Sequence, residues 1–351
     1  MIDFRYHLVS IVAIFLALSL GLLLGSTELK PYVQRGLNGL SKTEQRQIDT
    51  LLGEKQQLQG QISSENQFAL ANAPAMLHNV LAGQHVVLVL APGAPGSVTS
   101  GVAQAVQTAG ATVTGQLQLP TAFFDTSAAS SQKLSQVAQQ YAEPAGLTLA
   151  GTAQAQASEL LAHVIMTQGG PGQPLPGERD PVSVQAVQAL AGAGFLTKSG
   201  QPWDRATLAV VIIPGTPPSI DDTNAESQQL VTLAEQLNLA GLGTVVAGTV
   251  AGSGPGSAID VMRAGGRAGH LTSVDNADYP IGQIVVAQSL ADMEHGKSGS
   301  YGVTATASAP GPSPPPSPVP TVSPTVSPTA ATQGAASSRA GRPATTRSAK
   351  P

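Results

Sequence analysis

Three short segments of the chain bring a methionine close to a histidine: Met76-x-His78, His163-x-x-Met166 and Met293-x-His295. A thioether together with an imidazole suits Cu(I), and two or three such donors satisfy that ion. His163 and Met166 would share one face of a helix, so this pair is the first candidate. Met293 and His295 are the second candidate, because their spacing brings side chains together on an extended segment.

Core packing is the alternative explanation for the methionines, because Met in an apolar segment ordinarily fills gaps between other side chains. The sequence leaves both interpretations open for His163, Met166, Met293 and His295. The chain contains no cysteine, which excludes disulfides, thiolate metal sites and cysteine nucleophiles.

Motifs for other chemistry are weak. The loop Gly252–Ser257 follows an expected strand and precedes a helix expected to begin at Ala258, so its backbone N–H groups are candidates for holding a phosphate. The loop matches neither common nucleotide-binding glycine pattern, which favours a plain connection. The acidic pair Asp221-Asp222 precedes another expected helix, where Asp222 is a typical N-cap. We therefore predict that the protein is not an enzyme and has no catalytic residues and no resident cofactor. Copper is expected only as a transported or bound ion.

The composition limits the partners of the chain. The net charge is −4 and only 11% of the residues are charged, so a broad basic surface for nucleic acid is not expected. Gly and Pro are both frequent, with 38 and 27 residues, which indicates that part of the chain does not form packed structure.

An apolar run, Leu8–Leu24, stands near the start of the chain without a charged residue. A helix of this length spans about 25 Å, at the short end for a bilayer core. We predict a short segment over residues 1–7 and a transmembrane anchor over 8–26, in contact with membrane lipid. A cleaved signal peptide is the alternative, but no A-x-A-like site follows the run. A buried core helix is disfavoured because the run is apolar on every face.

A polar, periodic segment follows the anchor. Residues at alternating spacings of three and four form a heptad seam: Ile48, Leu51, Lys55, Leu58, Ile62, Glu65 and Ala69. We predict a coiled coil over residues 30–72 that ends before Pro74 and makes the protein a homo-oligomer. The alternative is a single amphipathic helix packed on the following domain.

The segment from 75 to 302 has the pattern of a layered α/β body. Apolar strands without alternation are expected at His85–Gly93, Leu208–Gly215 and Gly243–Gly248, and another strand near Thr112–Leu119. Helical segments separate them, which predicts a mostly parallel sheet covered on both faces. Residues 303–351 are rich in Pro, Ser and Thr, and we predict a disordered tail there. The tail has the composition of a spacer, a glycosylated segment or an inert extension.

The opening decapeptide Met1–Ser10, which runs directly into the anchor, resembles the mycobacterial copper transport protein B (MctB) family. Further similarity lies in Thr272–Asn276, in the segment from Gly282 to Leu290 and in Ser300–Gly302. The order of anchor, coiled coil and α/β body agrees from residue 1 to about 302. The Pro-rich tail is outside the resemblance.

The resemblance implies a role in copper homeostasis and efflux, proposed for the family as pore formation in the outer membrane. The sequence itself predicts an envelope membrane protein with a single N-terminal anchor and an extracytoplasmic body. The other hypothesis is a coiled-coil, membrane-anchored adaptor that recruits envelope or cell-wall proteins. Copper binding by the body would favour the first hypothesis, and a stoichiometric envelope partner would favour the second.

Overall fold

A seven-stranded sheet forms the centre of the body. The computed structural model describes residues 4–28, 30–199, 204–216, 223–266 and 270–313. The strands of the sheet are β1 (His85–Leu90), β2 (Thr112–Gln118), β3 (Thr197–Ser199), β4 (Leu208–Ile212), β5 (Gly243–Ala247), β6 (Thr272–Val274) and β7 (Ser300–Tyr301). Their order is β3-β2-β1-β4-β5-β6-β7, and all neighbouring pairs are parallel except β2 and β3. The predicted α/β class with a mostly parallel sheet is therefore confirmed.

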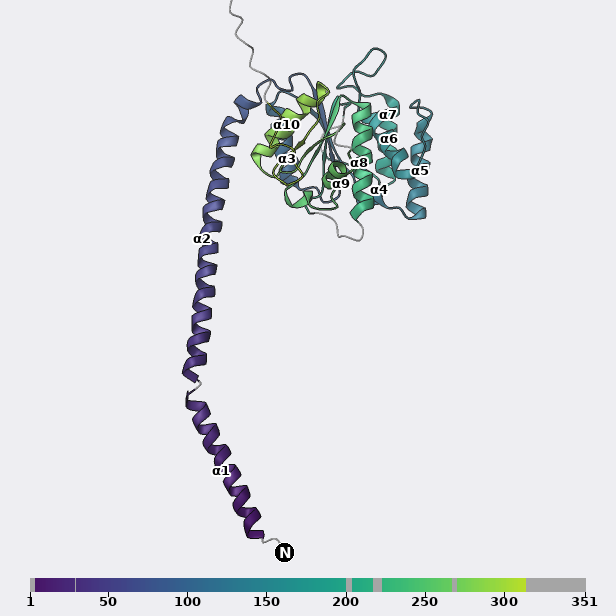
Figure 1. Cartoon of the computed structure of the whole chain (residues 1–351). Coiled ribbons are helices and arrows are strands. Elements are labelled where there is room, and N and C mark those ends of the chain that lie inside the picture. The colour runs from purple at the N-terminus through teal and green to yellow at the C-terminus, as the bar shows by residue number, and fades with distance from the viewer. Residues whose placement is uncertain (1–3, 29, 200–203, 217–222, 267–269, 314–351) are drawn as a thin grey trace, which may run out of the picture. The chain divides into compact units, whose positions relative to one another are not determined.

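Helices cover both faces of the sheet (Figure 1). On one face lie α3 (Gly96–Thr108), α10 (Pro280–Glu294) and the end of α2. The other face is covered by α4 (Thr121–Phe124), α5 (Ala128–Ala142), α6 (Ala153–Ile165), α7 (Pro181–Gly192), α8 (Thr223–Ala240) and α9 (Ala258–Ala264).

Alternation along β1 supplies both cores. Val86, Leu88 and Leu90 point to the α3/α10 side, whereas Val87 and Val89 point to the α6/α8 side. Because both faces are covered, the central strands are apolar at nearly every position, as the sequence shows.

Helix α1 (Phe4–Glu28) contains the predicted anchor segment. The large apolar side chains described in it, from Leu8 to Leu23, are more than half exposed. Within the described ranges, no helix combines the length and the apolarity needed to cross a membrane. The transmembrane anchor stays a prediction.

Helix α2 (Lys30–Met76) covers the predicted coiled-coil segment and continues beyond it. The prediction that Pro74 follows the helix is wrong, because Pro74 lies inside its last turn. Packing on the body holds that turn: Ala69 is 4% exposed, and Leu77, just after the helix, is fully buried. The middle of α2 remains exposed, with 58% of Leu58 accessible.

The body extends past its predicted end at residue 302. Residues up to 312 group with the body, and 313–351 form a separate unit. Residues 303–309 fold back on β7, where Ser308 Oγ donates to the Ser300 carbonyl at 2.8 Å. Residues 314–351, which hold most of the predicted tail, lie outside the described residues, as do Asp221 and Asp222.

Candidate functional site

The first predicted metal pair lies at the C-terminal end of α6. His163 is exposed and Met166 is 2% exposed, and both line a pocket of about 370 Å³ beside the end of α8. The structure therefore brings the two residues to one pocket, but it buries the methionine as core packing requires. No further soft donor lines this pocket, where Gln168 and Gln173 supply amides.

Arg205 dominates the electrostatics of that pocket. Its guanidinium donates to the carbonyls of His163 and Met166 at 2.5 and 2.7 Å, and to Asp180 Oδ2 at 2.7 Å. Partial burial of the His163 ring, together with the neighbouring Arg205 charge, lowers the pKa of His163. A neutral imidazole suits a metal ligand, but the guanidinium charge opposes a second cation.

The second predicted pair is not brought together. Met293 is buried in the α3/α10 core, where its sulfur accepts a hydrogen bond from Thr272 Oγ1 at 2.9 Å. His295 is exposed, and its Nδ1 lies 2.8 Å from the Ala291 carbonyl oxygen. In the described part of the chain, no three His, Cys, Asp or Glu side chains gather as a metal site.

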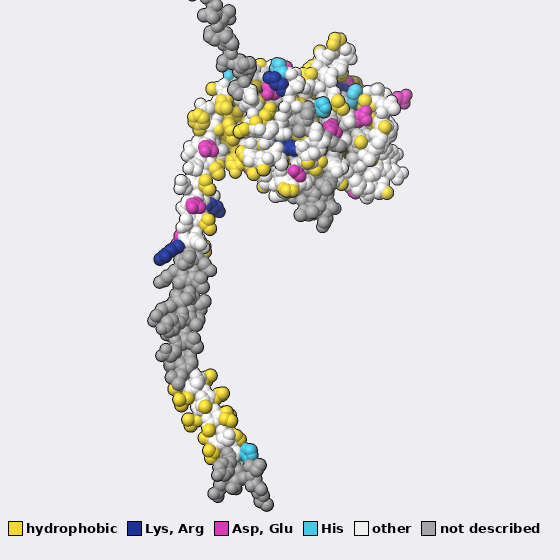
Figure 2. Space-filling model, viewed as in Figure 1, with side chains coloured by type: hydrophobic (Ala, Val, Ile, Leu, Met, Phe, Trp, Pro, Cys, Tyr) yellow, Lys and Arg dark blue, Asp and Glu magenta, His cyan; other side chains and the backbone are white. Residues whose placement is uncertain are grey.

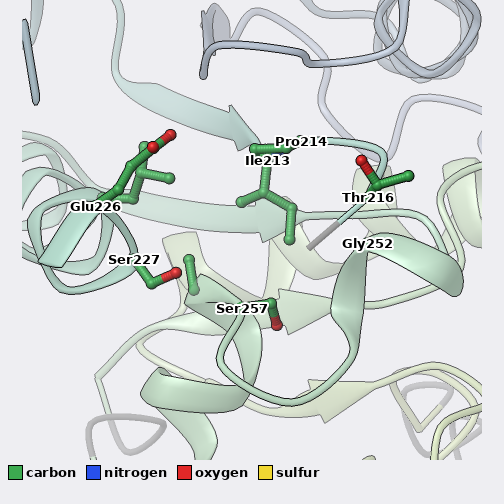
Figure 3. A pocket seen from close by; sticks show the side chains of 9 residues that line it. Ile213, Pro214, Thr216, Glu226, Ser227, Gly252 and Ser257 are labelled. Carbon is green, nitrogen blue, oxygen red and sulfur yellow. The ribbon is translucent and has the colours of Figure 1, made fainter. Parts of the chain in front are cut away.

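In the crevice between β1 and β4, where parallel α/β sheets commonly bind ligands, the loops after the two strands are joined by a hydrogen bond from the Gly215 N–H to the Gly93 carbonyl at 3.2 Å. The loops after β4 and β5 meet beside this crevice (Figure 3), and Thr249 Oγ1 donates to the Gly215 carbonyl at 2.9 Å. The cavity that these loops enclose with α8 and α9 measures about 10 Å³, room for about one water molecule. A side chain at Gly252 would collide with the Pro214 carbonyl, so glycine is needed for this close approach.

The Gly252–Ser257 loop forms the plain connection that its sequence favours. Its N–H groups bind within the loop and to α9: Gly252 donates to Thr249 Oγ1 at 2.8 Å, and Gly256 to Asp260 Oδ2 at 2.9 Å. Ser257 caps α9, which begins at Ala258 as predicted. These donors are thus already paired within the protein.

A groove of about 770 Å³ lies between α2 and the loops that follow β5 and β6. Yellow apolar side chains gather where the end of α2 meets the body in Figure 2. The main apolar lining of the groove comes from α2, α10 and the C-terminal segment: Ile62, Phe68, Ala69, Met76, Ile281 and Val303. We call this hollow the α2 groove.

A buried ion pair fixes one wall of the α2 groove. Arg263 Nη1 lies 2.8 Å from Asp275 Oδ2, and both side chains are at most 4% exposed. Asp275 also accepts the Val303 backbone N–H at 2.7 Å, which places Val303 at the groove. Gly302 turns with a φ of +132°, and a Cβ there would collide with the Asp275 carboxylate.

A buried polar side chain lines the α2 groove. Asn276 is 4% exposed and lines the groove, and its Oδ1 is buried without a partner. The nearby Asp278 accepts the Val250 N–H at 3.3 Å, and burial raises its pKa. Sequence reasoning missed this site. Its one signal is the polar stretch Asp275–Tyr279 directly after the short buried strand β6, a pattern too common to identify a groove.

Most of the chain matches a known protein family. The family described as "Copper transport outer membrane protein, MctB" matches residues 1–312. This chain belongs to the MctB family. The match includes the decapeptide Met1–Ser10 and reaches the end of the packed C-terminal segment.

Members of the MctB family share most of their length with this chain. The protein named "Copper transporter MctB" from Mycobacterium leprae (strain TN) is 32% identical over 314 residues, covering 86% of this chain and 96% of the relative. A protein of the same name from Mycobacterium tuberculosis (strain ATCC 25618 / H37Rv) is 30% identical over 311 residues, with the same coverage.

Proposed function

We propose that this member of the MctB family acts in copper homeostasis as an envelope membrane protein anchored by α1. Family membership is the observation that carries the proposal, because its description and its relatives' names refer to copper transport and the outer membrane. The exposed apolar side chains of α1 support the anchor, since a helix that is apolar on every side fits lipid better than water. The body lies on the extracytoplasmic side in this proposal.

Within the body, we propose Cu(I) binding at His163 and Met166. The two residues line one pocket, and the lowered pKa of His163 favours the neutral imidazole that binds a soft cation. A third donor, where Cu(I) takes three, would come from the pocket or from a molecule that carries the copper ion. The nearby Arg205 charge weakens binding, which fits an ion that is passed on rather than stored.

Competition with a Cu(I) chelator, using the full chain in detergent, tests this site. His163→Ala and Met166→Leu should each weaken binding at least about tenfold, because each removes one of two named donors. His270→Ala is the matched control, since it removes an exposed histidine from a different surface. Unchanged affinity in both variants would move the site elsewhere, and absence of binding to the unmodified chain would make any copper role indirect.

Transport itself is a separate part of the proposal. The sheet of one chain is covered by helices on both faces, so we propose that a copper-conducting pore would need several copies associated through α2. Lipid vesicles that are loaded with copper and carry the full chain should release the ion faster than copper-loaded vesicles without the protein. Retention of copper by vesicles whose chain still binds Cu(I) would restrict the function to binding.

An adaptor function is the second candidate, and the α2 groove favours it. Apolar hollows rimmed by polar groups are typical of protein-binding surfaces, and this groove is about twice as large as the pocket of His163. A photo-crosslinker at Phe68 should capture one envelope protein at equal stoichiometry, and Ile281→Asp should abolish the capture. A crosslinker at Leu175, exposed on a different loop, is the control. Capture of other copies alone would argue against the adaptor.

A catalytic role is not part of either proposal. The absence of enzymatic activity stays a prediction from the sequence.

A further inference from the structure

The charges in the α2 seam restrict how two copies can pair. In heptad terms, Lys55 occupies an a position and Glu65 a d position, among apolar seam residues that are exposed. Neither residue belongs to the three ion pairs within the described part of the chain. Charges at a and d positions lie inside a two-helix interface, so each needs an opposite charge across the pair.

Parallel pairing in register fails this requirement. It places Lys55 against its own copy and Glu65 against its own copy, which sets like charges inside the seam.

Antiparallel pairing gives both Lys55 and Glu65 an opposite charge across the pair. In antiparallel coiled coils, a positions face d positions of the partner. With the two-fold axis level with Gly60, Lys55 of one copy meets Glu65 of the other, and this pair forms twice. The same register sets Leu58 against the partner's Ile62 and Leu51 against the partner's Ala69. We propose that α2 pairs with a second copy of this chain as an antiparallel coiled coil in this register.

The α2 groove supports the register at its ends. Ile62, Glu65 and Ala69 line the groove together with the body, so the seam leads directly into it. Leu51 of the second copy then lies level with Ala69, which is already covered by its own body. The same turn of the second helix lies level with Phe68, which is 70% exposed in the single chain. One helix thereby lies along both the seam and the groove.

The arrangement has a consequence for the anchors. Antiparallel helices carry the two α1 segments at opposite ends of the pair. With both anchors in one membrane, the paired helices lie along the membrane surface. In a parallel pair, the two α1 segments would instead lie side by side at the same end of the coiled coil.

This inference rests on the self-association proposed above, and the first measurement separates the two. Light scattering of the full chain in detergent should report a dimer. A monomer would refute self-association itself, and with it the antiparallel pair, while leaving copper binding and the adaptor role intact. Every later test applies to a chain shown to be dimeric.

Disulfide trapping distinguishes the two directions, because the natural chain has no cysteine. Differently tagged full chains carrying Leu58→Cys and Ile62→Cys are mixed and exposed to a mild thiol oxidant. Antiparallel pairing predicts that the mixed disulfide is the main product. Parallel pairing offsets these two positions by about 6 Å along the axis and favours disulfides between identical positions, a result that would overturn the inference.

A charge exchange provides the second test. Lys55→Glu and Glu65→Lys should each weaken dimerisation about tenfold, because each places like charges across the pair twice. The double variant should restore the affinity to within about twofold, since antiparallel partners regain opposite charges. Asp49→Lys reverses a charge outside the seam and is the control. Failure of the double variant to recover would contradict the register.

Discussion

The central strands and the middle of α2 contain similar apolar residues but bury them to different extents. Every residue of β4 and β5 is buried, whereas Leu51 and Leu58 in α2 are 63% and 58% exposed. The strands are covered by this chain's own helices. Only the last turns of α2 reach the body, because a helix of 47 residues is about 70 Å long. The difference indicates that the body folds on its own contacts, while the described part of the chain leaves the apolar residues in the middle of α2 uncovered.

Removing Arg263 should have the largest effect on the body. Arg263→Met leaves the fully buried Asp275 carboxylate without its cation, and breaking such a pair typically costs about 3–5 kcal/mol. Denaturant unfolding of the full chain in detergent measures the loss. Arg179→Met is the control, because the Arg179–Asp204 pair is about 41% and 31% exposed and should contribute below about 1 kcal/mol. Equal losses in the two variants would contradict the assignment of the body's stability to buried contacts.

A pair of leucine substitutions compares the covered end of α2 with its exposed middle. Leu77→Ala should lower the free energy of unfolding of the body by about 2–5 kcal/mol, because Leu77 is fully buried. Leu58→Ala should change it by less than about 0.5 kcal/mol, because Leu58 is exposed in the single chain. Measurements are made at a protein concentration where the chain is monomeric. A large loss from Leu58→Ala in the monomer would show that the middle of α2 does stabilise the body.

Acid should affect the body through Asp180, the N-cap of α7. Burial alone would raise the pKa of Asp180, but hydrogen bonds from Ser183 and the Arg205 guanidinium outweigh it and lower the pKa to about 2. Because the folded pKa is depressed, this stabilisation is present above pH 4 and is lost as the pH falls toward 2.

The expected loss is about 1 kcal/mol, because a side chain that is 34% exposed is partly screened by solvent. Unfolding free energies between pH 5 and pH 2 measure it. Asp180→Asn should remove this part of the pH dependence, and an unchanged slope would contradict the role of Asp180.

The smallest effect is expected at Asp278. Partial burial raises the pKa of Asp278, so its charged form is less stable in the folded chain than in the unfolded chain. Asp278→Asn retains an acceptor for the Val250 N–H and should stabilise the chain by less than about 0.5 kcal/mol at pH 7, because solvent screens this exposed side chain. The gain should disappear as the pH falls below the ordinary pKa of the carboxyl group, where Asp278 is protonated too. Thermal unfolding at both pH values checks the sign.

Long apolar segments made the central elements predictable. The strands expected at His85–Gly93 and Gly243–Gly248 correspond to β1 and β5, because a strand covered on both faces is apolar throughout. The short strands β6 and β7 were not predicted. Three residues at Thr272–Val274 and two at Ser300–Tyr301 carry too little periodicity, and their pairing depends on neighbours distant in the sequence.

The candidate site shows the same division. Helical spacing predicted that His163 and Met166 would lie together, and they line one pocket. Local spacing gave no indication of Arg205, 39 residues beyond Met166, which donates to the carbonyls of both residues. The α2 groove likewise combines Phe68, Ile281 and Val303 from three distant segments.

The sequence by itself determined the α/β class and the helix over residues 30–72, because each depends on local patterns of apolar and polar residues. Particular segments such as Met1–Ser10 carried the resemblance to the family. The tertiary structure decided which of these residues are covered. Pro74 lies within the last turn of α2, just before the buried Leu77, Met293 is buried in the core, and residues 303–309 belong to the body through Asp275 and Arg263. Burial and hydrogen bonding between distant segments depend on how the elements pack together, and no local pattern encodes that packing.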